Sequence, residues 1–278
     1  MAAANSRQYI FIPMKNKFQF IPTAHDSALH AMHSQWRNQL SAPQDGMWES
    51  LTEASNHWVI EAYEKPIGYV SINEDSCLLQ SFLIPEWLDQ QEEVLSDCIS
   101  LLGVKQASVG TNDPLTLSMA LHAQKSVRLH SYLFEDCLKV EPEKKEGTIV
   151  LASVNSIDSL VTFYHKSTGA PETWLHHYLG DLIQKGELFY LEQQHEIAGS
   201  FEVRKRKTFP QVADIGMVVS PNHRRQGLGT FLLGQAKATA IEWEKAPICS
   251  CEKENLGSLK AIHNNGFRSV HQMLLIEF

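Results

Sequence analysis

One stretch, IGMVVSPNHRRQGLGTFLL (residues 215–233), reads as strand, turn and helix in direct succession. Residues 215–219 form an apolar run of strand type, which Pro221 ends. Gly227 and Gly229 then open a segment whose apolar residues recur at helical spacing. The first amides of a helix have no internal partner and sit at the positive end of its dipole, so they attract anions. Because glycine lets the backbone approach a ligand closely, this stretch predicts a phosphate-binding turn.

The glycine spacing separates this turn from two common phosphate-binding motifs. It lacks the G-x-x-x-x-G-K-[ST] pattern of nucleoside-triphosphate loops, and it lacks the G-x-G-x-x-G of dinucleotide folds with an acidic residue further on. The pattern is R-x-x-G-x-G, from Arg224 to Gly229, preceded by V-x-P. A second block follows in which Asn255, Ser258 and a Gly-Phe pair are spaced as N-x-x-S-(x7)-G-F. These residues could also be the start of a glycine-containing helix in some other α/β protein, without a role in binding phosphate.

Together the two blocks resemble the coenzyme A site of the GNAT superfamily of acyl-CoA N-acyltransferases. The resemblance implies that the strand before the turn splays from its neighbour and pairs with the pantetheine arm. It also implies that the loop amides hold the pyrophosphate and that Asn255 caps a helix and bonds the arm. Alternatively, Arg224 and Arg225 are solvated and Asn255 is only an N-cap. The implied cofactor-binding residues are Met217, Val218, Val219, Arg224, Arg225, Gln226, Gly227, Leu228, Gly229, Thr230, Asn255 and Ser258.

Acyl transfer to an amine requires a base, because the pKa of a typical alkyl amine is near 10. Glu202 and Asp214 lie on the two predicted strands that border the expected thioester, and they are the candidate catalytic residues. Each could instead be an exposed strand acid. Many relatives carry a tyrosine where this chain has Ile262. The thiolate then leaves without a side-chain acid, or a proton comes from Tyr178, Tyr190 or His263.

The two halves of the chain repeat one order of predicted elements. WVIEAYEKPIG (residues 58–68) aligns without a gap with FYLEQQHEIAG (residues 189–199), and Asn112 aligns with Asn255. We therefore expect an α+β fold of two tandem GNAT-like domains, residues 1–143 and 147–278, each a mixed, mostly antiparallel sheet flanked by helices. A charged stretch, EPEKKEG, would join them. The alternative is an unrelated N-terminal α+β cap.

The first half lacks the features of the glycine turn. After Pro85 it has Glu86 and Asp89, with no arginine and no glycine. Two carboxylates there would repel a pyrophosphate, so we expect residues 1–143 to form a degenerate domain without a coenzyme A loop.

Charge and composition narrow the range of partners. The net charge is −8, and all of this excess lies before residue 147, because residues 147–278 hold equal numbers of basic and acidic side chains. An acidic chain is a poor general binder of nucleic acid, and no apolar run approaches the ~20 residues of a membrane helix. The five cysteines form no C-x-x-C pair, and no secretion signal is evident, so we expect buried free thiols and a cytoplasmic protein.

Two other clusters, one of basic residues and one of histidines, are not expected to form functional sites. The run Arg204-Lys205-Arg206-Lys207 is expected to be a solvated turn. The adjacent histidines diverge on a helix, and no cysteine or acid completes a ligand set, so we expect no metal.

The sequence thus predicts an acyl-CoA-dependent N-acyltransferase of EC 2.3.1 type, most simply using acetyl-CoA, that transfers directly to an amine. The acceptor, a small molecule or a protein amine, cannot be read from the sequence because this fold hosts many acceptors. A monomer or homodimer is expected, without nucleic acid or membrane. The alternative is a non-catalytic acyl-CoA sensor or scaffold.

Overall fold

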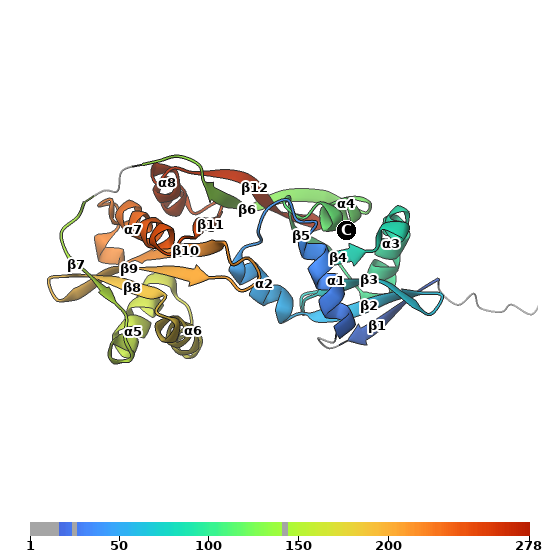
Figure 1. The fold of residues 1–278 in the computed structure, drawn as a ribbon, viewed down its shortest axis with the longest axis horizontal. Helices are drawn as coiled ribbons and strands as arrows, with labels where there is room; N and C mark the ends of the chain where they lie inside the picture. The colour runs from blue at the N-terminus through green and yellow to red at the C-terminus, as the bar shows by residue number, and fades with distance from the viewer. Residues whose placement is uncertain (1–16, 24–26, 141–143) are drawn as a thin grey trace, which may run out of the picture.

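The computed structural model describes residues 17–23, 27–140 and 144–278 (Figure 1). The predicted boundary between the domains lies between residues 143 and 147, next to residues 141–143, which are outside the described residues, and the domain limits stay a prediction. The first half comprises β1 (Phe18–Thr23), α1 (Ser27–Arg37), α2 (Gly46–Glu53), β2 (Asn56–Ala62), β3 (Lys65–Ile72), β4 (Cys77–Leu83), the 3-10 helix η1 (Pro85–Gln90), α3 (Gln91–Leu102), β5 (Gln106–Gly110), α4 (Pro114–Leu121) and β6 (Ser126–Asp136).

The second half repeats this order, which confirms the predicted duplication. It comprises β7 (Thr148–Leu151), η2 (Val154–Ser156), α5 (Ile157–Thr168), α6 (Glu172–Lys185), β8 (Leu188–Gln193), β9 (Glu196–Lys205), β10 (Val212–Val219), η3 (Pro221–His223), α7 (Leu228–Glu242), β11 (Ala246–Glu252), α8 (Leu256–Asn264) and β12 (Phe267–Glu277).

The first hairpin of each half shows why the gapless alignment holds. Two residues join β2 to β3, Tyr63 and Glu64, and their φ angles are 52° and 62°. The aligned residues Gln194 and His195 join β8 to β9, with φ angles of 50° and 64°. A two-residue hairpin whose residues both have positive φ matches the right-handed twist of its strands. The same tight turn therefore fixes the strand register in both halves.

All twelve described strands form one mixed sheet, in the order β1-β2-β3-β4-β5-β12-β6-β11-β10-β9-β8-β7. The last strand of each half is exchanged: β12 lies between β5 and β6 of the first half, and β6 lies between β12 and β11. In Figure 1 these two long strands cross from one half to the other along the upper side of the molecule. The halves are thus joined through backbone hydrogen bonds, as well as through the chain.

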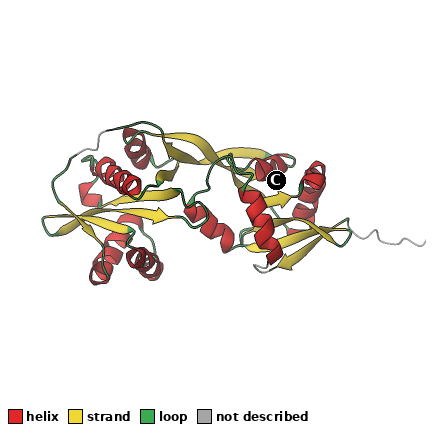
Figure 2. Ribbon diagram, in the orientation of Figure 1, coloured by secondary structure: helices red, strands yellow, loops and turns green. Residues whose placement is uncertain are grey.

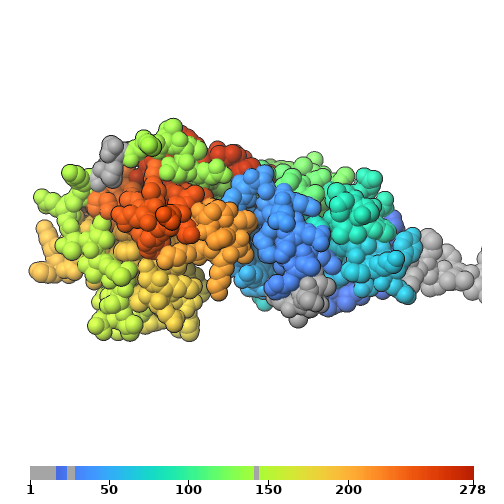
Figure 3. All heavy atoms as spheres, viewed as in Figure 1, coloured from blue at the N-terminus to red at the C-terminus, as the bar shows by residue number. Residues whose placement is uncertain are grey.

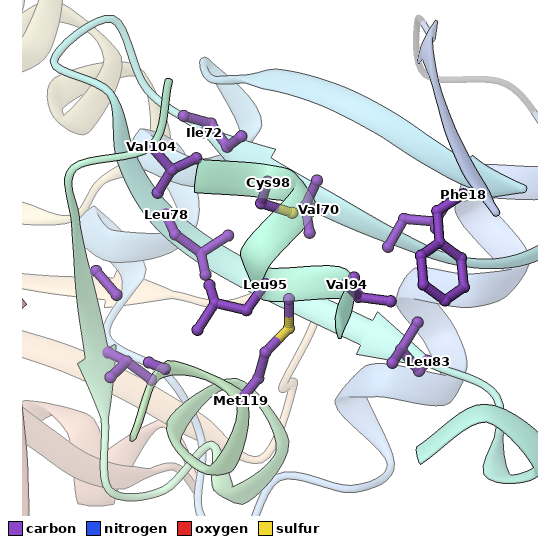
Figure 4. Close-up of a cluster of buried hydrophobic side chains, with 14 of the residues drawn as sticks. Phe18, Val70, Ile72, Leu78, Leu83, Val94, Leu95, Cys98, Val104 and Met119 are labelled. Carbon is purple, nitrogen blue, oxygen red and sulfur yellow. The ribbon is translucent and has the colours of Figure 1, made fainter. Parts of the chain in front are cut away.

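Helices cover both faces of the sheet in the second half (Figure 2). On one face α7 and α8 pack on β9, β10 and β11 around Phe201, Ile215 and Leu232. On the other face α5 and α6 form a second core with Leu188 of β8. The first half has its own core beneath α3 and α4, where Val94, Leu95, Cys98 and Met119 meet the strands (Figure 4), and α1 packs separately around Tyr69 and Phe82.

Candidate active site

The strand before the glycine turn splays from its neighbour. β10 pairs with β9 as far as Val219, but it pairs with β11 only from Val212 to Asp214. Beyond Asp214 the edge of β10 that faces β11 is therefore not part of the ladder. Residues 215–219 offer backbone groups there to a ligand, as the resemblance implies for the pantetheine arm.

The turn after β10 is built from left-handed backbone conformations. Arg225 has a φ of 62°, and Gly227, the N-cap of α7, has a φ of 80°. Gly227 adopts this conformation without the steric penalty that other residues meet. A Cβ on Gly229 would lie 3.5 Å from the Cε of Met217, an ordinary contact distance, so Gly229 places the start of α7 directly beside β10.

A groove of about 970 Å³ runs along this turn and the splayed strand. We call it the cofactor groove. Arg224, Arg225 and Lys260 line it, and no Asp or Glu is among its lining residues, so its charge favours an anion. Of the predicted set, it is lined by Met217, Val218, Val219, Arg224, Arg225, Gly227, Leu228, Gly229, Thr230, Asn255 and Ser258; Gln226 is absent, because its side chain turns back to the carbonyl of Asn222.

The two arginines of the turn differ. Arg224 is held, because its Nη2 donates to the carbonyl oxygen of Ser167 at 2.8 Å and its Nε donates to that of Val219 at 3.4 Å. Arg225 is exposed. Asn255 caps α8, accepting from the amide of Ser258 at 3.2 Å, and it also faces the groove. Capping and ligand contact are therefore compatible for this residue.

A second cavity, of about 720 Å³, opens from the cofactor groove and extends between the two halves. We call it the interdomain cavity. It shares Met217, Asn255 and Ser258 with the groove, so ligands in the two spaces would meet there. The first half supplies much of its wall from α2, β4, β5 and β6. These residues could not be predicted individually, because local sequence patterns do not show which distant segment a face will oppose.

Glu202 lies beside the splay. It sits opposite Gly216 in the β9–β10 register, and a Cβ on Gly216 would be 2.9 Å from its Oε1. Tyr178 of α6 donates to its Oε2 at 2.6 Å, and Arg204 Nε lies 3.6 Å from Oε1. Burial, and next the charge of Glu202, raise the pKa of the Tyr178 hydroxyl, which therefore stays protonated and donates. Gly216 lines the interdomain cavity, while Glu202 itself is not among the lining residues of this cavity or of the cofactor groove.

Asp214 is buried in a different setting. Its Oδ2 pairs with Nη1 of Arg206 at 2.9 Å, and its Oδ1 accepts from the amide of Gly46 at 3.2 Å. Burial, reinforced by the charge of Asp45, raises the pKa of Asp214 to about 6. Arg206 is itself buried, and Arg204 is nearly so, which makes the prediction of a solvated turn at residues 204–207 wrong for the two arginines, whereas Lys205 and Lys207 are exposed. Arg204 pairs with the nearby Glu202, but Arg206 also pairs with Glu49, which lies far away in the sequence.

Both halves match known families. Residues 154–267 match the acetyltransferase (GNAT) family, and residues 25–137 match a further acetyltransferase (GNAT) domain. The chain belongs to the GNAT superfamily. It is a GNAT-family acetyltransferase with two GNAT domains in tandem, and its family implies an acyl-CoA co-substrate. No curated protein matches it.

Solved structures agree with this tandem GNAT architecture. A GNAT-family acetyltransferase from Colwellia psychrerythraea is 27% identical, with a TM-score of 0.87 over 94% of this chain and 99% of its own. A GCN5-related N-acetyltransferase from Sphaerobacter thermophilus shares the fold at 12% identity, with a TM-score of 0.65 over 95% and 96%. A tandem GNAT protein from the clavulanic acid biosynthesis pathway shares the fold at 13% identity, with a TM-score of 0.60 over 93% of this chain and 97% of its own.

In the first GNAT domain the position that corresponds to Asn255 is closed. Asn112 is fully buried, and its Nδ2 donates to the carbonyls of Ala42 and Pro43 at 3.2 and 3.3 Å. Its neighbour Asp113 accepts from Nε1 of Trp36 at 2.9 Å. The first domain thus fills with its own chain the space that is open beside Asn255. The start of α3 also lacks a glycine turn, since η1 leads directly into it.

Of the groups considered for the departing thiolate, none combines reach with an available proton. Ile262 lines the interdomain cavity, but its side chain has no acidic proton to donate. His263 is exposed and packs edge-on against Phe134, with ring centroids 5.5 Å apart. The Tyr178 hydroxyl already donates to Glu202. Tyr190 packs against the core formed with α5 and α6, and it lines neither cavity.

Two general features complete the site. Within the described part of the chain no group of three His, Cys, Asp or Glu side chains could hold a metal, and no described helix is long and apolar enough to cross a membrane. The five cysteines are free thiols; four are buried, and Cys137 is exposed, contrary to the expectation that all are buried.

Proposed function

We propose that this tandem GNAT protein transfers an acetyl group from acetyl-CoA in the cofactor groove to an amine in the interdomain cavity. The observation that carries the proposal is the contrast of charge between two spaces that meet. The cofactor groove is lined by cations and no carboxylate, whereas the interdomain cavity is lined by carboxylates and no Lys or Arg. A polyanionic cofactor suits the first, and a protonated amine suits the second.

The residues present fit coenzyme A. The positive groove at the start of α7 suits a pyrophosphate, and Gly229 leaves room for it beside Met217. Arg224, Arg225 and Lys260 would supply charge, and the free edge of β10 would supply backbone partners for the pantetheine arm. When bound, acetyl-CoA supplies a thioester carbon that an amine can attack.

Glu202 is the base in this proposal. It accepts a proton from the ammonium group, directly or through one water, and the freed nitrogen attacks the acyl carbon. Tyr178 donates a hydrogen bond to the carboxylate and Arg204 lies beside it, so these two side chains hold it in position. The bond to sulfur then breaks, the nitrogen passes its second proton to water, and the thiolate takes a proton from water, since Ile262 occupies the position of the usual tyrosine.

Isothermal titration of coenzyme A tests the cofactor groove. We expect one site per chain. The variant Gly229→Glu should bind at least about 100-fold more weakly, because its carboxylate would enter the phosphate region. Gly180→Glu is the matched control, since a side chain there meets open space on α6.

Two results would contradict the proposal: unchanged affinity in Gly229→Glu, or two equal sites per chain. Release of free thiol from acetyl-CoA in the presence of amines then separates a transferase from an acyl-CoA sensor. Tight binding without thiol release across the amines would favour the sensor.

A further inference from the structure

The interdomain cavity has a lining that restricts what can enter it. Among the described residues, its charged lining residues are Asp45 and Glu252, and His130 is the one other titratable group besides its cysteines. A carboxylate or phosphate brought into this space would lose water and meet no cation. The cavity therefore discriminates against anionic ligands, because its described lining residues include no Lys or Arg.

Asp45 is fixed so that its charge remains available to the cavity. Its Oδ1 accepts from the amides of Met47 and Trp48 at 2.9 and 3.3 Å, which caps α2. Its Oδ2 accepts from the hydroxyl of Ser250 on β11 at 2.8 Å. These three donors are neutral, so they orient the carboxylate without cancelling its charge.

The remaining wall is largely apolar. Helix α2 has eight residues, and it turns Met47, Trp48 and Leu51 toward the cavity although Met47 and Leu51 are 50% and 58% exposed. Exposing large apolar side chains to water is energetically unfavourable, and a ligand that covers them would gain binding free energy. The cavity is lined further by Leu79, Leu133, Met273 and Leu275, together with neutral polar side chains such as Gln106, Ser108 and Ser131.

We propose that the acceptor is a primary amine on an uncharged, mostly apolar body, and that amines which also carry a carboxylate or phosphate are rejected. This rests on the proposed function, since it identifies the substrate class of the same site. The cavity has a volume of about 720 Å³, of which the part along Ile215, Gly216 and Met217 would hold the pantetheine arm, and the rest suits a small molecule. The carboxylates attract the ammonium group, and the side chains of α2 cover the apolar body.

Equilibrium binding of two matched probes tests the proposal. Octylamine and 8-aminooctanoate have the same chain and differ in one carboxylate. With the coenzyme A-loaded protein we expect octylamine to bind at least 10-fold more tightly, measured by saturation-transfer NMR titration. Coenzyme A affinity is measured first by calorimetry. If coenzyme A fails to bind, the proposed function fails, while the same probes on the unloaded chain still test the cavity.

A charge placed on α2 should change this preference. Leu51→Lys adds a cation at a half-exposed position, and it should narrow or reverse the ratio between the two probes. Leu101→Lys, at a position 51% exposed on α3 and away from the cavity, should leave the ratio unchanged. No binding of octylamine, equal binding of both probes by the unaltered chain, or the same ratio in Leu51→Lys would overturn the proposal.

Discussion

Glu202 and Asp214 lie on adjacent strands and point to the same side of the sheet, but their neighbours give them different roles. Glu202 is held by a phenol and a guanidinium beside the splay of β10. Asp214 is enclosed by Arg206 and the start of α2, where β10 still pairs with β11. Neither carboxylate lines a cavity itself, but Glu202 lies opposite Gly216, which lines the interdomain cavity. We therefore assign proton transfer to Glu202 and a structural role to Asp214.

Glu202→Gln should lower kcat by about 10²–10⁴ and flatten the acidic limb of the pH–rate profile, because it removes the base. The KM for acetyl-CoA should change little, since Glu202 does not line the cofactor groove. Steady-state kinetics between pH 6 and 10 measure both. Glu196→Gln, an exposed acid at the start of the same strand, is the control. A near-normal kcat for Glu202→Gln at all pH values would exclude this residue as the base.

The raised pKa of Asp214 predicts how stability depends on pH. Between pH 4 and 6 the folded protein keeps a proton on Asp214 that the unfolded chain has released, because the folded pKa is about 6. Its contribution to the free energy of unfolding therefore falls as the pH rises through this window, by on the order of 2–3 kcal/mol in total. Urea unfolding of the wild type and of Asp214→Asn, repeated at several pH values, measures this contribution.

The difference in unfolding free energy, wild type minus Asp214→Asn, should decrease between pH 4 and pH 6 and stay level above pH 7. A difference that increases over that window would mean that the ion pair with Arg206 lowers the pKa of Asp214 instead.

Helix α2 belongs to the first half but is fastened to the second. Arg206 Nη1 donates to the carbonyl of Gln44 at 2.7 Å, and its Nη2 lies 2.6 Å from Glu49. The hydroxyl of Thr208 also donates to Glu49. A Cβ on Gly46 would lie 2.5 Å from Asp214, so α2 can approach this closely only because residue 46 is glycine. One buried arginine thus positions one wall of the interdomain cavity.

Arg206→Gln should raise the KM for the amine acceptor by about 10-fold or more and leave the KM for acetyl-CoA within about 2-fold. The reason is that α2 lines the interdomain cavity and not the cofactor groove. Loss of a buried ion-pair partner should also cost about 3–5 kcal/mol of unfolding free energy. Arg128→Gln, an exposed arginine on β6, is the control. An equal rise of both KM values would show that Arg206 supports the whole site.

The elements that could be predicted from the sequence are those with a local cause. The strand at residues 213–219 and the helix after Gly227 follow from apolar spacing and a glycine, and the structure has β10 and α7 there. The burial of Arg206 could not be predicted, because its charge argues for solvent until Glu49 and Asp214 are known to surround it. The place of α2 over the interdomain cavity likewise depends on contacts between distant segments.

On the scale of the whole molecule, the continuous sheet makes the two halves one structural unit. β12 pairs with β5 and β6, and β6 pairs with β11, so neither half contains all of its own sheet. In Figure 3 the orange surface of the second half also meets the blue surface of α1 and α2 without a break. Unfolding one half would therefore expose strand edges in the other.

Differential scanning calorimetry should show one cooperative transition for the chain, although two domains of this size could melt separately. Coenzyme A at about 100 times its Kd should stabilise the folded state by about 2.7 kcal/mol and move the whole transition upward. If two transitions appear and coenzyme A shifts only one of them, the two halves unfold independently and the prediction is wrong. Gly229→Glu serves as the control, because its transition should not respond to the ligand.

The position of β12 separates the order of synthesis from the order of assembly. β5 and β6 are made early, but the strand that lies between them comes after every other described strand. A growing chain therefore holds two open strand edges in its first half while the whole second half is being translated. Such edges can pair with each other or with another chain. The half that is made first is thus completed last, and it is exposed to wrong pairing until β12 has been translated.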